Sequence, residues 1–213
     1  YRTTEHYLAY FQSFSNTYGP VEKLKRLYEE ALEHPQVVGI VIGTRPDCVD
    51  EEKLDYLADL ADGKAMPGWS RTVNGEIRTS PIVIVEYGVE SCHDETLARI
   101  NRGHDFETAR TAIEMTAARG IDVGAHFIIG LPGETKQMML DSCALINSLP
   151  IRSVKFHQLQ IVKGTRMEQE YSENQQDFER FTLEEYLDFF VDMLEYLSPD
   201  LYIVRFVGEV PPR

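Results

Sequence analysis

The chain has 213 residues, and its 35 Asp and Glu residues outnumber its 21 Lys and Arg residues, for a formal net charge of −14. It has no apolar run of about 18 residues, so no membrane-spanning helix is predicted. Such a negative surface repels phosphate backbones, which argues against nucleic acid binding through a broad basic face and leaves only a local basic pocket open.

The three cysteines, Cys48, Cys92 and Cys143, are far apart in the sequence. Their number and spacing fit neither a set of metal ligands nor a disulfide framework. This usage is typical of a reducing compartment, so we expect a cytoplasmic protein. Residues 1–5 carry no signal-peptide pattern and no initiator Met, so we expect that the natural protein has a segment upstream of them.

Short apolar runs alternate with helical patterns through the first part of the chain. A strand is predicted at 7–11, and a helix opened by Pro20 is stopped by His34-Pro35. The β-branched run at 37–42 predicts a strand buried on both faces, followed by a helix capped by Asp50. The Gly- and Pro-rich residues 62–79 predict a long loop or a small hairpin.

The same alternation continues to the C-terminus. Thr182 and Glu185 form a capping box for the last helix, on which Tyr186, Phe189, Phe190 and Tyr196 are interpreted as core contacts. The predicted elements are a strand from 82, helices at 94–100 and 106–119, a strand at 121–129, a helix at 138–149, a strand at 153–161, a helix at 182–197 and a strand at 201–207.

This order predicts an α/β fold, because strands joined by helical crossovers pair in parallel. The sheet is either a barrel or an open doubly wound sheet. No linker-like composition divides the chain, so we predict a single domain over residues 1–213, with residues 201–213 as its C-terminal strand and tail.

Polar and glycine residues follow the predicted strands, at the end where parallel α/β folds bind ligands. Each residue alone is most simply a solvated loop residue, but together they predict a site. They are Gln12 and Ser13, Gly43, Thr44 and Arg45, Glu86, Gly88 and Glu90, Gly130 and Gly133, and Gln158 and Gln160.

Three features within this set have specific chemical interpretations. The turn at 130–134 could hold a planar base by its backbone, or be a plain strand-to-helix turn. Arg102 could clamp a carboxylate with its two parallel N–H groups. His126 lies within a strand and is either a core histidine or a ligand-facing one.

These motifs, in this order, resemble the radical S-adenosylmethionine (SAM) superfamily. The likeness is to the branch of the Elongator catalytic subunit, the tRNA methylthiotransferases and oxygen-independent coproporphyrinogen oxidase, and within it to bacterial YhcC-type proteins. It covers residues 7–164 and is carried by residues 7–12, 43–49, 86–91, 97–104, 130–135 and 161–164.

The resemblance implies a partial (β/α)6 barrel that holds SAM and a [4Fe-4S] cluster, with this chain lacking the first β/α unit. It implies that Gln12 and Ser13 meet the SAM amino group, and that Arg102 reaches the carboxylate. Glu90 and His126 would contact the ribose, while Gly130 and Leu159 would border the adenine. Relatives often have an acidic residue where this chain has Gly43, and the resemblance implies that Thr44 or Arg45 takes over its contact.

The chain departs from the family at the cluster. Family members bind it through a Cys-x3-Cys-x2-Cys loop, and no such loop occurs here. We therefore expect no metal ligands in this chain, an inactive fragment, and ligand cysteines elsewhere in a longer protein. An open edge at strand 7–12 is expected to let the fragment dimerise.

The resemblance implies an enzyme that cleaves SAM reductively to a 5′-deoxyadenosyl radical, which abstracts hydrogen from a substrate that the sequence does not identify. Its partners would be that substrate and an electron donor. Glu86 is the candidate for orienting substrate or SAM, or else forms a structural ion pair with Arg45 or Arg102. The alternatives are a cluster-free β/α-barrel hydrolase or lyase that uses Glu86, Glu90 and His126, and a SAM- or nucleotide-binding module without chemistry.

Overall fold

The computed structural model describes residues 5–207. The strands are β1 Tyr7–Phe11, β2 Val37–Thr44, β3 Arg71–Val73, β4 Glu76–Arg78, β5 Ile82–Glu90, β6 Asp122–Ile129, β7 Ser153–Gln158 and β8 Tyr202–Arg205. The helices are α1 Val21–Glu33, α2 Glu51–Ala61, α3 Asp94–Arg99, α4 Phe106–Ala117, α5 Lys136–Ser148, α6 Arg166–Glu173 and α7 Leu183–Tyr196, with short 3-10 helices η1 Pro46–Cys48 and η2 Gln175–Asp177.

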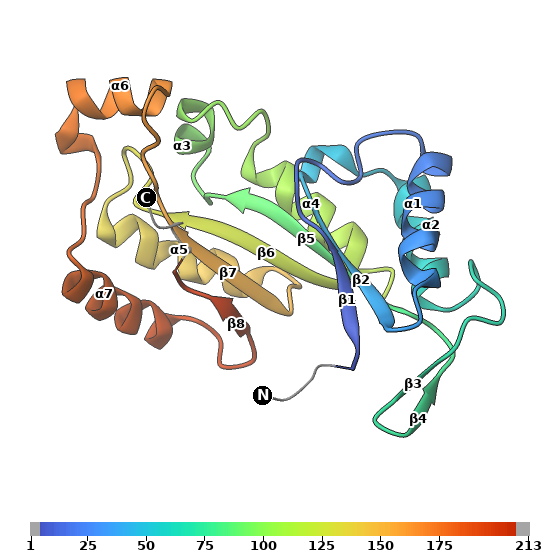
Figure 1. The fold of residues 1–213 in the computed structure, drawn as a ribbon. Coiled ribbons are helices and arrows are strands. Elements are labelled where there is room, and N and C mark those ends of the chain that lie inside the picture. The colour runs from blue at the N-terminus through green and yellow to red at the C-terminus, as the bar shows by residue number, and fades with distance from the viewer. Residues whose placement is uncertain (1–4, 208–213) are drawn as a thin grey trace. The chain divides into compact units, whose positions relative to one another are not determined.

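Six strands form one sheet in the order β1-β2-β5-β6-β7-β8 (Figure 1). The pairs β1–β2, β2–β5 and β7–β8 are parallel. This sheet confirms the prediction of an α/β fold of the partial-barrel type. Among residues 5–207, β1 forms one edge of the sheet. Dimerisation through that edge stays a prediction.

The chain divides into two compact units. The first unit comprises Tyr1–Gly88 and Thr111–Gly124, and the second comprises Val89–Arg110 and Ala125–Arg213. Residues 1–4 and 208–213, which include most of the predicted C-terminal tail, lie outside the described residues.

Local signals explain the elements of the first unit. The β-branched run of β2 is buried along almost its whole length, as predicted for a strand covered on both faces. The Asp50 carboxylate accepts a hydrogen bond from the Lys53 backbone N–H at 3.0 Å, which confirms the predicted cap of α2. The predicted loop or hairpin contains the antiparallel pair β3–β4, turning at Asn74 and Gly75.

The second unit has an aromatic core on one face of β6 and β7. The Phe156 ring lies 6.2 Å from the Phe127 ring and 5.5 Å from the Phe190 ring of α7. The capping box of Thr182 and Glu185 opens α7 as predicted. The prediction that Tyr196 is a core contact is wrong, because its side chain is 59% exposed near the end of α7.

The largest differences from prediction concern two strand ends and one helix. The strand predicted at 153–161 ends at Gln158. Leu159 and Ile161, which the prediction included in the strand, instead line a cavity after its end. The strand predicted at 201–207 is shorter, since Phe206 turns to pack on Phe190 at a ring distance of 4.9 Å. Helix α6, which is polar and has no buried residue, was not predicted.

No helix within residues 5–207 combines the length and the apolar character needed to cross a lipid bilayer.

Candidate functional site

Glu90 ends strand β5 in an unusual backbone conformation. Its φ angle is +73°, in the left-handed region that residues with a side chain seldom adopt. Such a conformation costs about 1–3 kcal/mol at a residue other than glycine, and persists where the surrounding structure requires it. Strain of this kind clusters at functional sites, which supports the prediction that Glu90 belongs to one.

The loop after α3 brings Arg102 to Glu90. The Arg102 backbone N–H donates to the Leu97 carbonyl at 2.9 Å, and Asn101 and Gly103 on either side of it have positive φ angles. This turn sets the Arg102 guanidinium 3.3 Å from the Glu90 carboxylate, with both side chains about one-fifth exposed. The predicted carboxylate-binding arginine therefore has a carboxylate of the chain as its neighbour.

His126 lies on β6 and also belongs to the second unit. Its ring centre is 5.7 Å from that of His157 on the neighbouring strand β7. His126 also acts on the Glu90 carboxylate, whose pKa it lowers. Burial has the opposite and larger effect, so the pKa of Glu90 is raised above the ordinary glutamate value despite Arg102 and His126.

This raised pKa predicts a pH dependence of stability. The native state favours the protonated Glu90 carboxyl, so the stability that it contributes is complete below the ordinary pKa of 4.5 and is lost as the pH rises through the raised value. The free energy of unfolding of the wild type should therefore fall, relative to that of Glu90→Gln, as the pH rises above 4.5. Urea titrations of both proteins at several pH values measure this difference, and a constant difference would contradict the assignment.

A cavity of about 440 Å³ opens at the ends of β6 and β7. Gly130 and Leu159, the two predicted adenine contacts, both line it. The Leu159 backbone N–H donates to the Ile129 carbonyl at 2.9 Å, which fixes one wall. The full lining is Ile129, Gly130, Gln158, Leu159, Ile161, Tyr171, Phe178, Glu179, Arg180, Phe181, Thr182, Leu183, Tyr186 and Val207.

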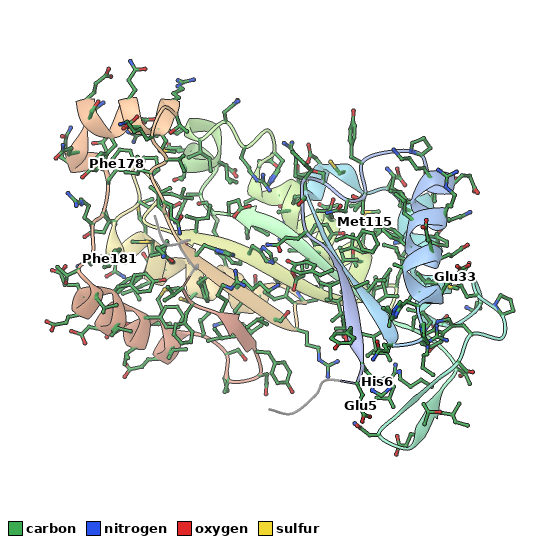
Figure 2. The ribbon with its side chains drawn as sticks, viewed as in Figure 1. Glu5, His6, Glu33, Met115, Phe178 and Phe181 are labelled. Carbon is green, nitrogen blue, oxygen red and sulfur yellow. The ribbon has the colours of Figure 1, made fainter. Side chains whose placement is uncertain are left out.

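Aromatic side chains form much of the opposite wall, and the sequence analysis did not identify them as site residues. Phe178 and Phe181, labelled in Figure 2, come from the segment that joins α6 to α7. Tyr171 lies edge-on to Phe178 at 5.2 Å, and Phe181 lies edge-on to Tyr186 at 5.7 Å. Their only signal in the sequence was an aromatic residue every few positions, which a core helix would also produce.

The turn after β6 allows close approach to the backbone. Gly130 and Gly133 have φ angles of +85° and +90°, which suit glycine. A Cβ at Gly130 would meet the Glu179 carbonyl at 3.2 Å. The Gly133 N–H donates to the Asp177 carbonyl at 2.7 Å, so this amide is already used by the protein. Glu134 is buried and accepts a hydrogen bond from the Ser91 hydroxyl.

The other predicted site residues belong to the first unit. Gln12 and Ser13 are exposed after β1. The Thr44 hydroxyl is buried and hydrogen bonded to Thr17 at 2.6 Å, and Arg45 forms two hydrogen bonds to Asp47, at 2.8 and 2.5 Å. Both Thr44 and Arg45 thus already have partners within the chain.

Glu86 is buried on β5 and accepts a hydrogen bond from the Tyr10 hydroxyl at 2.6 Å. This partner on β1 was not among the alternatives that the sequence suggested. The charged partners that were suggested, Arg45 and Arg102, lie against Asp47 and Glu90 respectively.

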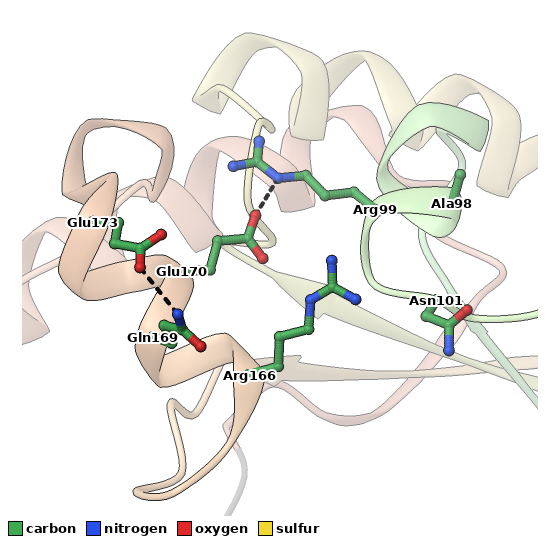
Figure 3. A pocket seen from close by; sticks show the side chains of 7 residues that line it. All are labelled: Ala98, Arg99, Asn101, Arg166, Gln169, Glu170 and Glu173. Atoms are coloured by element: carbon green, nitrogen blue, oxygen red, sulfur yellow. Dashed lines mark hydrogen bonds and ion pairs between the residues drawn. The ribbon is translucent and has the colours of Figure 1, made fainter.

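A second cavity, of about 450 Å³, lies between α3 and α6 (Figure 3). Its Arg99 side chain bonds Glu170 and Asp177, both at 2.6 Å, and Gln169 bonds Glu173 at 3.1 Å. The Arg99–Glu170 pair ties α6 to α3, and the Arg99–Asp177 pair ties the following η2 to α3, which explains how a helix without buried residues is held in place. Most of the charged side chains that line this cavity therefore interact with other lining residues.

The three cysteines do not form a metal site. Burial raises the pKa of Cys92 to about 12 and that of Cys143 to about 11, so both remain thiols at neutral pH, whereas metals bind thiolates. Within residues 5–207 no three His, Cys, Asp or Glu side chains are grouped to hold a metal ion. The described residues therefore do not fit an iron–sulfur cluster.

Comparisons with known proteins match the chain to two family models. Residues 75–146 match the Radical SAM superfamily, and residues 151–213 match the Radical_SAM C-terminal domain. Protein MJ0486 of Methanocaldococcus jannaschii is 36% identical over 96% of this chain, and protein YhcC of Escherichia coli is 33% identical over 93%. The chain covers 58% and 59% of these two relatives, so it spans less than two thirds of their length.

Solved structures show the same fold. An archaeal Elp3 from Methanocaldococcus infernus superposes with a TM-score of 0.75 and 19% identity, over 98% of this chain and 49% of that one. The Escherichia coli coproporphyrinogen III oxidase HemN, described as a radical SAM enzyme, superposes with a TM-score of 0.58 and 16% identity, over 85% of this chain and 38% of that one.

Proposed function

Because this chain belongs to the radical SAM superfamily, we propose that it forms the SAM-binding part of an enzyme that cleaves SAM reductively. The observation that carries the proposal is the pairing of Glu90 with Arg102 at the end of β5. A mostly buried ion pair on a strained backbone lowers the free energy of unfolding, so a purely structural role does not explain it. A zwitterionic ligand that engages both charges would account for it.

The second unit suits the separate parts of SAM. Arg102 would bind the carboxylate through its guanidinium N–H groups, and Glu90 with His126 would accept and donate hydrogen bonds at the ribose. The adenine is planar and largely apolar on its faces, so it fits the cavity beside Gly130 and Leu159. The roles that the resemblance implies for residues of the first unit stay predictions; these residues are Gln12, Ser13, Thr44, Arg45 and Glu86.

Bound SAM, given one electron through the family's iron–sulfur cluster, would supply the reductive carbon–sulfur cleavage and the hydrogen abstraction from substrate. The chain's own residues bind and orient SAM. The apolar walls of the cavity would keep water from the adenine end of the ligand.

We further propose that the cluster ligands lie outside this chain, since the cysteines present do not fit the role. The greater length of the relatives supports this proposal. The 213-residue chain alone should then bind SAM without cleaving it.

The experiment is a SAM cleavage assay on the full-length protein that contains this chain. The protein is purified without oxygen, reconstituted with iron and sulfide, reduced with dithionite and given SAM, and the products are quantified by mass spectrometry. Formation of 5′-deoxyadenosine and methionine in equal amounts is expected. An intact cluster with bound SAM but no 5′-deoxyadenosine would favour a binding module, and absence of SAM binding would leave the cluster-free hydrolase or lyase.

A further inference from the structure

The second cavity, of about 450 Å³, has two helical walls that both belong to the second unit (Figure 3). One wall is formed by α3 and by Asn101 in the turn that follows it. The other is a single face of α6, because its lining residues have the spacing of neighbours on a helix surface. These residues are Arg166, Gln169, Glu170 and Glu173. A cavity of this volume is large enough to bind a small molecule.

The carboxylates of this cavity already have partners. Glu170 accepts a hydrogen bond from Arg99 Nε at 2.6 Å, and Glu173 accepts one from the Gln169 side chain at 3.1 Å. Glu170 lies four positions after Arg166, where a carboxylate is a neighbour of a basic side chain on the same helix. Because Glu170 is bonded to Arg99 of α3, α6 offers Arg166 no other carboxylate one turn away.

Two polar side chains of the cavity have no such partner. Among residues 5–207, neither the Arg166 guanidinium nor the Asn101 carboxamide forms a hydrogen bond or an ion pair. Figure 3 shows the Arg166 side chain extending from the first turn of α6 into the cavity, with Asn101 on the α3 side. A guanidinium only donates hydrogen bonds, and an amide nitrogen donates two. The unused groups of the cavity are therefore mainly donors, and one of them is positively charged.

We propose that this cavity binds the anionic group, a carboxylate or a phosphate, of a small molecule through Arg166 and Asn101. The parallel N–H groups of a guanidinium match two oxygens of either anion. The Asn101 amide would donate a further hydrogen bond to the same group. Glu173 does not oppose this binding directly, because it lies seven positions from Arg166, about 10 Å along the axis of α6.

This site is distinct from the one proposed for SAM. Neither Glu90 nor Arg102 lines the cavity. Asn101 and Gly103 have positive φ angles, and the turn that they form brings Arg102 to Glu90 while Asn101 stays in the cavity wall. SAM has a single carboxylate, which is assigned to Arg102. The anion bound by Arg166 therefore belongs to a different molecule.

The test is a titration of the full-length protein labelled with 15N, in which NMR follows the side-chain amide of Asn101. Loss of this signal in Asn101→Gly identifies it, and glycine tolerates the positive φ angle of this position. Sodium phosphate and sodium succinate are added separately, at constant ionic strength. At least one of them is expected to shift the signal saturably, and the anion that does so shows whether the site takes a phosphate or a carboxylate. Because the titration uses neither SAM nor reductant, its failure is distinct from failure of the cleavage assay.

Arg166→Gln is expected to raise the dissociation constant of that anion by about 10-fold or more, since the lost hydrogen bonds join two charged groups. Arg166 is exposed, and glutamine forms helices nearly as readily as arginine, so the variant should fold. Lys163→Gln is the matched control. It removes one positive charge three positions away, from an exposed residue that lines neither of the two cavities described above, and should bind as the wild type does.

The proposal is overturned if neither anion shifts the Asn101 signal, or if Arg166→Gln and Lys163→Gln bind alike. It is also overturned if Arg102→Gln abolishes the binding while Arg166→Gln retains it, because the anion would then occupy the position assigned to the SAM carboxylate.

Discussion

Replacing Gly39 by valine is expected to prevent stable folding of the first unit. Gly39 lies opposite Ile82 in the parallel ladder between β2 and β5. A Cβ at this position would stand 2.3 Å from the Ile82 carbonyl oxygen and 2.6 Å from the Ile82 Cβ. Because the first of these atoms belongs to the backbone of the paired strand, the strands must separate, at a loss of about 3 kcal/mol or more.

Urea unfolding followed by Trp69 fluorescence measures this effect. Trp69 is buried in the first unit and its indole N–H donates to the Leu32 carbonyl at 3.1 Å, so its emission reports on that unit. Gly75→Ala is the control, because Gly75 has a φ angle of +85° with no atom within 4 Å of a Cβ. The control should lose only about 1 kcal/mol. Equal losses in the two variants would contradict the steric account.

Replacing Arg102 by glutamine is expected to weaken SAM binding by the full-length protein about 30-fold or more, which corresponds to about 2 kcal/mol for loss of one partner of a buried charge pair. The substitution removes the donors proposed for the SAM carboxylate and leaves Glu90 without the cation 3.3 Å away. Equilibrium dialysis with radiolabelled SAM measures the dissociation constant.

Arg110→Gln is the matched control for this prediction. Arg110 also belongs to the second unit and is also paired with a carboxylate, that of Glu107 at 2.5 Å. It lines neither of the two cavities described above and has no assigned role at SAM, so its loss should leave the dissociation constant near the wild-type value. Circular dichroism establishes that both variants are folded. Similar SAM affinity in Arg102→Gln and Arg110→Gln would remove Arg102 from the site.

Elements with strong local signals were predictable from the sequence. The β-branched run of β2, the Asp50 cap of α2 and the capping box at Thr182 each act within a few residues, and each is confirmed. Helix α6 was missed because it buries no residue and depends on ion pairs to Arg99, about 70 positions away in the chain. No periodicity of apolar residues marks such a helix.

The candidate site was predictable only where a local sequence pattern decides the position of a residue. The strand patterns place Glu90 at the end of β5 and His126 within β6, as the structure has them, while their role at SAM stays a prediction. The partners of Arg45 and Glu86 depend on side-chain conformation, which the sequence pattern does not specify.

The most direct test of the account is a crystal structure of the full-length protein with bound SAM, grown without oxygen. The account predicts that the carboxylate of SAM lies on the Arg102 guanidinium and that the adenine lies against Gly130 and Leu159. Well-defined SAM that contacts neither Arg102 nor the cavity beside Gly130 would contradict it.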